Sequence, residues 1–134
     1  MKQEIQKKYV ELQLLNQHIK QVQEQFVFLQ QQLNELMNLE ISISELKEIK
    51  DESEIFSSLG SGIFINSKIL NKEKVLVNIG SGILVEKNLI DAVQLIKNQS
   101  NVVSTSIENI REQLTKAMMY SEELSNELNQ LSPE

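Results

Sequence analysis

One pattern occurs twice near the middle of the chain, as Leu59-Gly60-Ser61-Gly62-Ile63-Phe64-Ile65 and, twenty residues later, as Ile79-Gly80-Ser81-Gly82-Ile83-Leu84-Val85. The two copies contain all four glycines of the sequence, namely Gly60, Gly62, Gly80 and Gly82. Glycine adopts the positive φ angles of a tight reversal, and the β-branched residues that follow suit a pleated strand. The pattern therefore predicts two consecutive β-hairpins that turn at the glycines.

Alternation along these strands predicts an apolar face that the chain cannot cover by itself. One set of alternating positions is apolar and nearly all β-branched, while the other set mixes apolar and polar residues. We expect a four-stranded sheet with two open edges. Each aliphatic side chain on its apolar face gains about 1.5 to 3 kcal/mol on burial, but the chain has too few residues outside the sheet to cover that face. Other subunits are the expected cover. The candidate residues for subunit assembly are Ile63, Phe64, Ile65, Ile69, Val75, Val77, Ile79, Ile83 and Val85.

Composition limits the possible compartments and partners. The absence of cysteine excludes a thiolate metal site and fits a reducing compartment. No apolar run approaches the roughly 20 residues of a membrane span, and Met1-Lys2-Gln3-Glu4 lacks the apolar stretch of a signal peptide. A net charge of -6 argues against nucleic acid as a partner, because that affinity comes mostly from lysine and arginine. We expect a soluble cytoplasmic protein that binds neither nucleic acid nor membrane.

The amino-terminal part of the chain has heptad periodicity. Its a positions are Ile5, Leu12, Ile19, Phe26 and Leu33, and its d positions include Leu15, Val22, Leu29, Leu36 and Ile43. This spacing predicts a helix of about 40 to 45 residues that ends by Asp51 to Ser53. Glu40 falls where the next a residue belongs, which predicts a stutter or a widening of the helix pair near the sheet.

A second heptad series follows the second hairpin. Asn88 can cap a helix, and Asp91 lies in its first turn, where a carboxylate favours the helix dipole. The a and d positions of this helix are Val93, Ser100, Ile107, Leu114, Ser121 and Leu128, and Ile96, Val103, Ile110, Ala117, Leu124 and Leu131; Pro133 marks its end. The fold class is therefore α+β, a long antiparallel two-helix coiled coil with two central β-hairpins. We expect a helical part over 1–52, an assembly region over 53–87 and a second helical part over 88–134, with the two termini together and far from the hairpins.

Positions e and g of the first helix favour an intramolecular pair. They are largely uncharged, where a zipper that selects a separate partner would place Glu and Lys. The residues concerned are Tyr9, Asn16, Gln23, Gln30 and Met37 at e, and Glu11, His18, Gln25, Gln32 and Leu39 at g.

These features together resemble the alpha-type subunits of the prefoldin family, archaeal-type chaperone chains also called GimC. The two matched heptad helices around a double hairpin are similar to the family over the whole chain. The most specific part is the second hairpin, Val75 to Val85, which runs through Glu86 and Lys87 into the carboxy-terminal helix. Two hairpins resemble the alpha type, since beta-type subunits have one.

The resemblance implies a hetero-hexamer of two alpha and four beta subunits, whose hairpins join in an intersubunit β-barrel. It implies an ATP-independent holdase that captures unfolded client proteins at the coiled-coil tips and delivers them to a group II chaperonin. Neither a catalytic activity nor a cofactor is implied. A structural coiled-coil adaptor, which assembles in the same way but ignores unfolded clients, is the alternative.

The tip residues give a hypothesis for client binding. Val10 and Leu14 lie on the outer face of the first helix one turn apart, and flexible apolar surfaces suit clients of varied sequence. The candidate client-binding residues are Ile5, Tyr9, Val10, Leu12, Leu14, Leu124, Leu128 and Leu131. In the alternative interpretation Ile5, Leu12, Leu124, Leu128 and Leu131 only complete the seam between the helices.

Other patterns favour structural interpretations. The Gly-Ser-Gly sequences lack the lysine and the following helix of a phosphate loop, and His18 is the only histidine, so no His-based metal cluster or catalytic triad is possible. The acidic residues Glu122, Glu123 and Glu127 favour a solvated face, with docking to a basic surface as the alternative. Val27 and Phe28 lie off the seam, where they either line a cavity or contact a neighbour.

Overall fold

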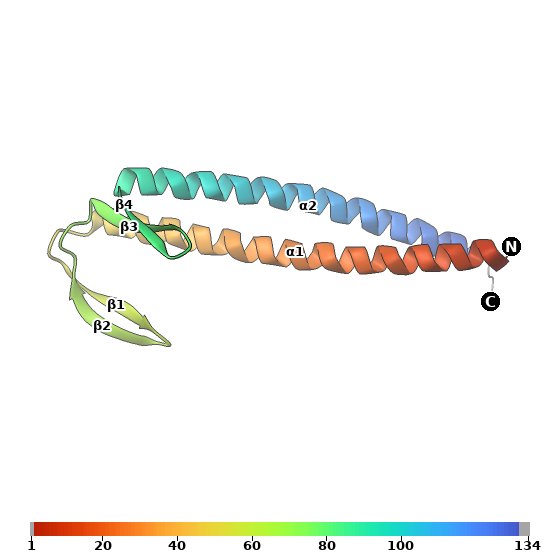
Figure 1. Cartoon of the computed structure of the whole chain (residues 1–134), viewed down its shortest axis with the longest axis horizontal. Coiled ribbons are helices and arrows are strands. Elements are labelled where there is room, and N and C mark those ends of the chain that lie inside the picture. Colours follow the sequence, from red (N-terminus) through yellow and green to blue (C-terminus); the bar gives the residue numbers. More distant parts are fainter. Residues whose placement is uncertain (1, 132–134) are drawn as a thin grey trace. The chain divides into compact units, whose positions relative to one another are not determined.

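The computed structural model describes residues 2–131 as two helices and four strands (Figure 1). Their order is α1 (Lys2–Glu48), β1 (Glu54–Gly60), β2 (Ile63–Lys68), β3 (Lys74–Gly80), β4 (Ile83–Asn88) and α2 (Leu89–Leu131). The predicted fold class is confirmed. The chain divides into a terminal unit, residues 1–34 with 102–134, and a central unit, residues 35–101, which we describe separately.

In the terminal unit the two helices run antiparallel. The Lys8 ammonium group donates a hydrogen bond to Glu127 Oε2 at 2.7 Å, and Ser121 Oγ donates one to Asn16 Oδ1 at 2.9 Å. Residues near the start of α1 thus contact residues near the end of α2, so the described ends of the two helices lie together, as predicted. Pro133, the predicted end of the second helix, lies outside the described residues.

The predicted heptad positions form the seam of the terminal unit. Its most buried side chains are Val22 from α1 and Ile107, Leu124 and Leu128 from α2. The neighbouring a and d positions are half-buried and the remaining heptad positions are mostly exposed, so the seam is narrow. At about 1.5 to 3 kcal/mol for each fully buried aliphatic side chain, this seam is the main source of stability for the helix pair.

In the central unit the seam keeps its heptad phase through Glu40 and Ile43, and the predicted stutter lies after them, because Leu46 at a g position is half-buried while Lys47 at the next a position is exposed. The Glu40 carboxylate occupies an a position, is half-buried, and accepts a hydrogen bond from Ser100 Oγ at 3.5 Å. Ser100 is itself an a residue, so two polar side chains face each other across the seam and are joined by a long hydrogen bond. The helix pair also widens here, because a cavity of about 110 Å³ lies beside Glu40. Its lining includes Ile43, Val93 and Ile96.

The ends of the two helices in the central unit are capped by side chains. At the start of α2, Asn88 Oδ1 accepts a hydrogen bond from the backbone N–H of Asp91 at 2.9 Å, which confirms the predicted cap. α1 ends at Glu48, a few residues before the predicted boundary. There, the Lys72 ammonium group donates to the carbonyl oxygens of Lys47 at 3.0 Å and Ile49 at 2.7 Å. A cation at this end also favours the helix dipole.

Replacing Lys72 with methionine is expected to loosen the end of α1 and the linker between the hairpins. Two carbonyl groups lose a charged donor, which we expect to cost about 1 to 3 kcal/mol locally. Hydrogen exchange at the backbone amides near Lys47 and Ile49 measures this loss as faster exchange. Lys74→Met is the control, because Lys74 makes only an exposed ion pair of 4.0 Å with Glu86. Equal exchange in both variants would contradict the capping role.

The two hairpins repeat each other residue for residue. In the first, Glu54 pairs with Lys68 and Ser58 with Phe64, followed by a bulge before Gly60; in the second, every pair lies twenty positions later, with the same bulge before Gly80. Ser61 and Ser81 at the turn tips have φ angles of 48° and 51°, and the flanking glycines also have positive φ. The predicted hairpins and their glycine turns are confirmed.

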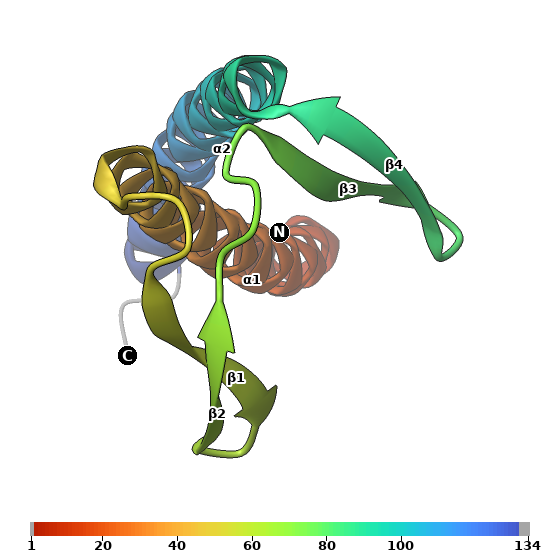
Figure 2. The ribbon, with the colours of Figure 1, turned by 90° about the vertical axis from the view of Figure 1, so that its left-hand side faces the viewer.

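The predicted four-stranded sheet is wrong, because the hairpins form two separate two-stranded sheets (Figure 2). The linker between β2 and β3 uses its backbone groups elsewhere: Ile69 bonds to Glu52 and Ser53 in the turn before β1, and the Glu73 carbonyl accepts from the N–H of Leu89 at the start of α2. With these groups engaged, no ladder between β2 and β3 can start in the linker.

Candidate functional site

The hairpins expose most of their apolar side chains. In the second hairpin, Val77 lies opposite Val85, and both are half-buried together with Val75 on the same face. The opposite face presents Leu76 and Leu84, which are 67% and 57% exposed. Both faces of a two-stranded sheet are thus largely apolar, and each hairpin leaves its outer backbone edges without a strand partner among the described residues. Edges and faces of this kind are suited to association with another chain.

The predicted assembly residues fall into two groups. The half-buried group is Ile69, Val75, Val77 and Val85, and the exposed group is Ile63, Phe64, Ile65, Ile79 and Ile83. Sequence reasoning missed Phe56 on β1, which is 73% exposed and lies opposite Asn66. The twenty-residue repeat aligns Phe56 with Leu76, so extending the repeat backwards from the glycines would have found it.

The structure places the predicted client-binding residues in one region but in two different environments. Tyr9, Val10 and Leu14 are more than half exposed on α1. The other candidates lie in the seam of the terminal unit; Leu124 and Leu128 are each only 4% exposed, and the half-buried ones are Ile5, Leu12 and Leu131. The exposed set offers most of its side-chain surface to another protein while the helices stay paired, whereas Leu124 and Leu128 offer almost none.

Polar contacts lock the helices together in this same region. The hydrogen bond to Glu127 raises the pKa of Lys8, and the hydrogen bond to Glu11 raises the pKa of the Tyr120 hydroxyl. Both donors are protonated at neutral pH even at their ordinary pKa values, and the shifts extend that range to higher pH. Glu127, one of the three acidic residues considered for docking, is therefore occupied by a contact within the chain.

Residues 2–131 carry neither a metal-binding cluster nor a membrane-spanning helix. In that range no group of three or more His, Cys, Asp or Glu side chains is placed to hold a metal ion. No helix in the same range has the length and apolar character needed to cross a membrane.

Two antiparallel heptad helices that carry paired hairpins with uncovered apolar faces are typical of a subunit of a larger assembly. The family model described as Prefoldin subunit matches residues 15–134, so the chain belongs to the prefoldin family. This is a family of chaperone subunits and not of enzymes. The resemblance inferred from the sequence is confirmed.

Two curated relatives are both alpha subunits. The chain is 31% identical over 75 residues to Prefoldin subunit alpha of Methanococcus maripaludis strain C5 and 32% identical over 77 residues to Prefoldin subunit alpha of Methanococcus aeolicus. Each match covers 56% of this chain, and the chain spans about half the length (50%) of each of these relatives.

A solved structure has the same fold. It is described as filamentous PFD from Methanocaldococcus jannaschii, and it matches with a TM-score of 0.58 at 18% identity over 92% of this chain and 96% of that one. This likeness supports the helix and hairpin arrangement.

Proposed function

We propose that this chain is the alpha-type subunit of a cytoplasmic, ATP-independent holdase, a hexamer of two alpha and four beta-type subunits. The complex captures unfolded proteins at the ends of its coiled coils and delivers them to a group II chaperonin. The observation that carries the proposal is the pair of uncovered apolar hairpins on one chain, which gives each alpha subunit two places to join partners. Family membership supports the chaperone role.

The assembly surface and the client surface lie in different units of the chain. Assembly uses the hairpins of the central unit, where the nine predicted assembly residues and Phe56 gather. Client contact uses the terminal unit, where Tyr9, Val10 and Leu14 are exposed beside the closed seam. The seam residues Leu124 and Leu128 reach a client only where the helix ends separate.

The test is co-expression with a beta-type subunit, native mass measurement and an aggregation assay on several unrelated denatured proteins without nucleotide. We expect a hexamer that delays the aggregation of all of them. Val10→Ser with Leu14→Ser is expected to leave the hexamer intact and to require about three times more complex for the same delay, since two of several weak contacts are lost.

The alternative function predicts a different result. A structural adaptor would form the oligomer and leave every denatured protein to aggregate, and that outcome would overturn the holdase proposal. Full suppression by the Val10 and Leu14 double variant would contradict the outer-face assignment alone.

A further inference from the structure

The methionines that the structure describes all lie on the surface of the molecule. Methionine commonly fills gaps in hydrophobic cores, but the buried side chains of residues 2–131 are those of valine, leucine, isoleucine and alanine. Met37, Met118 and Met119 are 52%, 50% and 60% exposed. Because the sequence has no cysteine, methionine also supplies every sulfur atom of the chain. Any oxidant of sulfur therefore acts on thioethers that are open to solvent.

Met118 lines a groove of about 400 Å³ that both helices of the terminal unit form. The polar part of its lining consists of four neutral side chains and one carboxylate, namely Asn16, Ser121, Ser125, Asn126 and Glu122. Ser121 Oγ donates a hydrogen bond to Asn16 Oδ1 at 2.9 Å. This bond uses the carbonyl oxygen of the Asn16 amide, and among residues 2–131 no protein acceptor is bonded to its nitrogen. The Asn16 amide can therefore donate to a further acceptor in the groove.

Hydrogen peroxide oxidises a thioether to a sulfoxide by a two-electron step. The sulfur attacks one peroxide oxygen, and a sulfur–oxygen bond forms as the oxygen–oxygen bond breaks. The departing hydroxide takes the proton of the transferred hydroxyl group and leaves as water. Hydrogen-bond donors stabilise the negative charge that develops on the departing oxygen, whereas nearby carboxylates oppose it. The same donors favour the product, because a thioether sulfur is only a weak acceptor and a sulfoxide oxygen is a stronger one.

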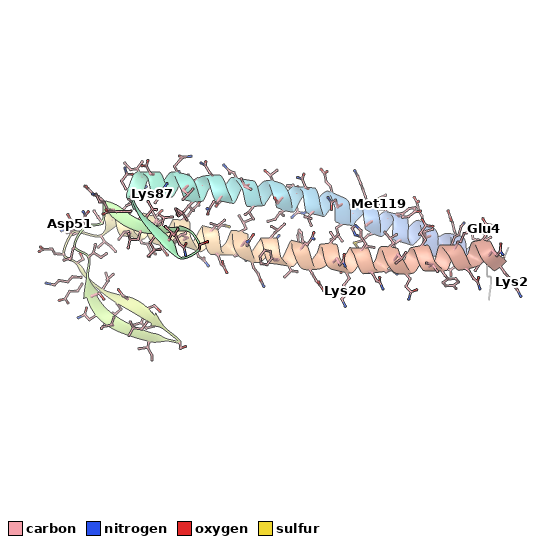
Figure 3. All side chains as sticks on the ribbon, in the orientation of Figure 1. Lys2, Glu4, Lys20, Asp51, Lys87 and Met119 are labelled. Carbon is pink, nitrogen blue, oxygen red and sulfur yellow. The ribbon has the colours of Figure 1, made fainter. Side chains whose placement is uncertain are left out.

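The other two described methionines provide comparisons within the chain. Met37 lines a groove of about 380 Å³ in the central unit, whose polar lining is one serine and three carboxylates, namely Ser44, Glu40, Glu45 and Glu48. Met119, which Figure 3 labels, occupies the outermost heptad position of α2 and lines neither of these two grooves. If exposure alone set the rate of oxidation, Met119 would react first and the other two would react alike.

We propose that Met118 is a modification site for oxidants of the peroxide class, and that the Asn16 amide binds the resulting sulfoxide. The oxidised side chain then adds a polar contact between α2 and α1 beside the one that Ser121 makes. A methionine sulfoxide reductase restores the thioether: two thiols become a disulfide, and the sulfoxide oxygen leaves as water. An oxidising environment thus strengthens the pairing of the helices in the terminal unit, and the change is reversible.

The test exposes the full chain to dilute hydrogen peroxide, both alone and assembled with a beta-type subunit. Tandem mass spectrometry of the digested chain follows the gain of one oxygen atom at each methionine separately. We expect Met118 to be oxidised about fivefold faster than Met37, although both are about half exposed, and also faster than Met119. Equal rates, a fastest reaction at Met119, or a preference for Met118 only in the assembled complex would overturn the site.

Two variants assign the rate to the amide. Asn16→Asp keeps the size of the side chain and replaces the amide with a carboxylate, so it is expected to slow oxidation of Met118 about fivefold and to leave Met37 and Met119 unchanged. Ser121→Ala is the control, because it removes the hydrogen bond to Asn16 and keeps the Asn16 amide. Met118 in this control is expected to react close to its wild-type rate. Equal effects of the two variants would contradict the role of the amide.

Hydrogen exchange tests the contact that the sulfoxide makes. Exchange at the backbone amides around Asn16 and Met118 is expected to slow about threefold after peroxide treatment, and to recover after treatment with a methionine sulfoxide reductase. Met118→Leu keeps an apolar side chain of similar size that peroxide does not oxidise, so its exchange is expected to stay the same. Faster exchange in the oxidised wild-type chain, no change, or equal slowing in the Met118→Leu variant would overturn the proposed contact.

Discussion

Replacing Leu124 and Leu128 together with alanine is expected to destabilise the terminal unit by about 4 kcal/mol or more, since each Leu→Ala change in a packed core costs about 2 to 5 kcal/mol. Both side chains are only 4% exposed and lie one turn apart on α2, so a continuous stretch of the seam is emptied. Hydrogen exchange resolved along the chain is expected to show fast exchange over residues 2–34 and 102–131, with slow exchange retained in the central unit.

The matched control removes similar mass from the outside of the same helix. Met118→Ala with Met119→Ala should cost less than about 1 kcal/mol, because both side chains are at least half exposed. Client suppression by the leucine variant should fall only at temperatures where its terminal unit has opened. A leucine variant that keeps its exchange protection and still loses client binding would show that these residues meet clients directly.

Introducing Val77→Asp with Val85→Asp is expected to abolish hexamer formation with beta-type subunits. The two valines are cross-strand partners on the half-buried face of the second hairpin. Two carboxylates placed opposite each other repel, and each costs several kcal/mol if a partner covers it without a counter-charge. Native mass measurement after co-expression should therefore show subcomplexes in place of the hexamer.

A control adds the same charge at the turn tips. Ser61→Asp with Ser81→Asp introduces two carboxylates at exposed positions whose φ angles of 48° and 51° aspartate tolerates. This variant is expected to assemble normally. If the valine variant also assembles, the partner must cover the opposite face, formed by Leu76 and Leu84.

Much of the fold follows from local rules that the sequence displays directly. The heptad positions from Ile5 to Ile43 and from Val93 to Leu131 could be assigned because the seam is formed within one chain by two regular helices. The glycine turns and the Asn88 cap could be assigned because each depends on a few adjacent residues.

The errors arose where a residue's neighbours come from elsewhere in the chain. Glu40 looked like a break in the heptads, because nothing near it in sequence shows that Ser100 would lie opposite and bond to it. The expected single sheet failed because Ile69 bonds to the turn before β1 and Glu73 bonds to the start of α2, and such pairings depend on backbone groups distant in sequence.

The candidate client site was predictable only in part for a similar reason. Heptad letters place Val10 and Leu14 outside and Leu124 and Leu128 inside, and the structure agrees with both placements. Heptad positions do not predict whether the two helices separate near their ends to bind a client. That separation depends on the strength of contacts such as the one between Lys8 and Glu127.

The likeness of the two hairpins creates a problem during folding. Because β1 resembles β3 and β2 resembles β4, the ladder that joins β1 to β2 would be almost as well formed between β1 and β4. Chain entropy resolves the competition: closing a loop of more than twenty residues costs about 2 kcal/mol more than closing a two-residue turn. Each glycine turn therefore also serves as a kinetic safeguard, ensuring that a strand meets its nearest neighbour before it can meet the duplicate.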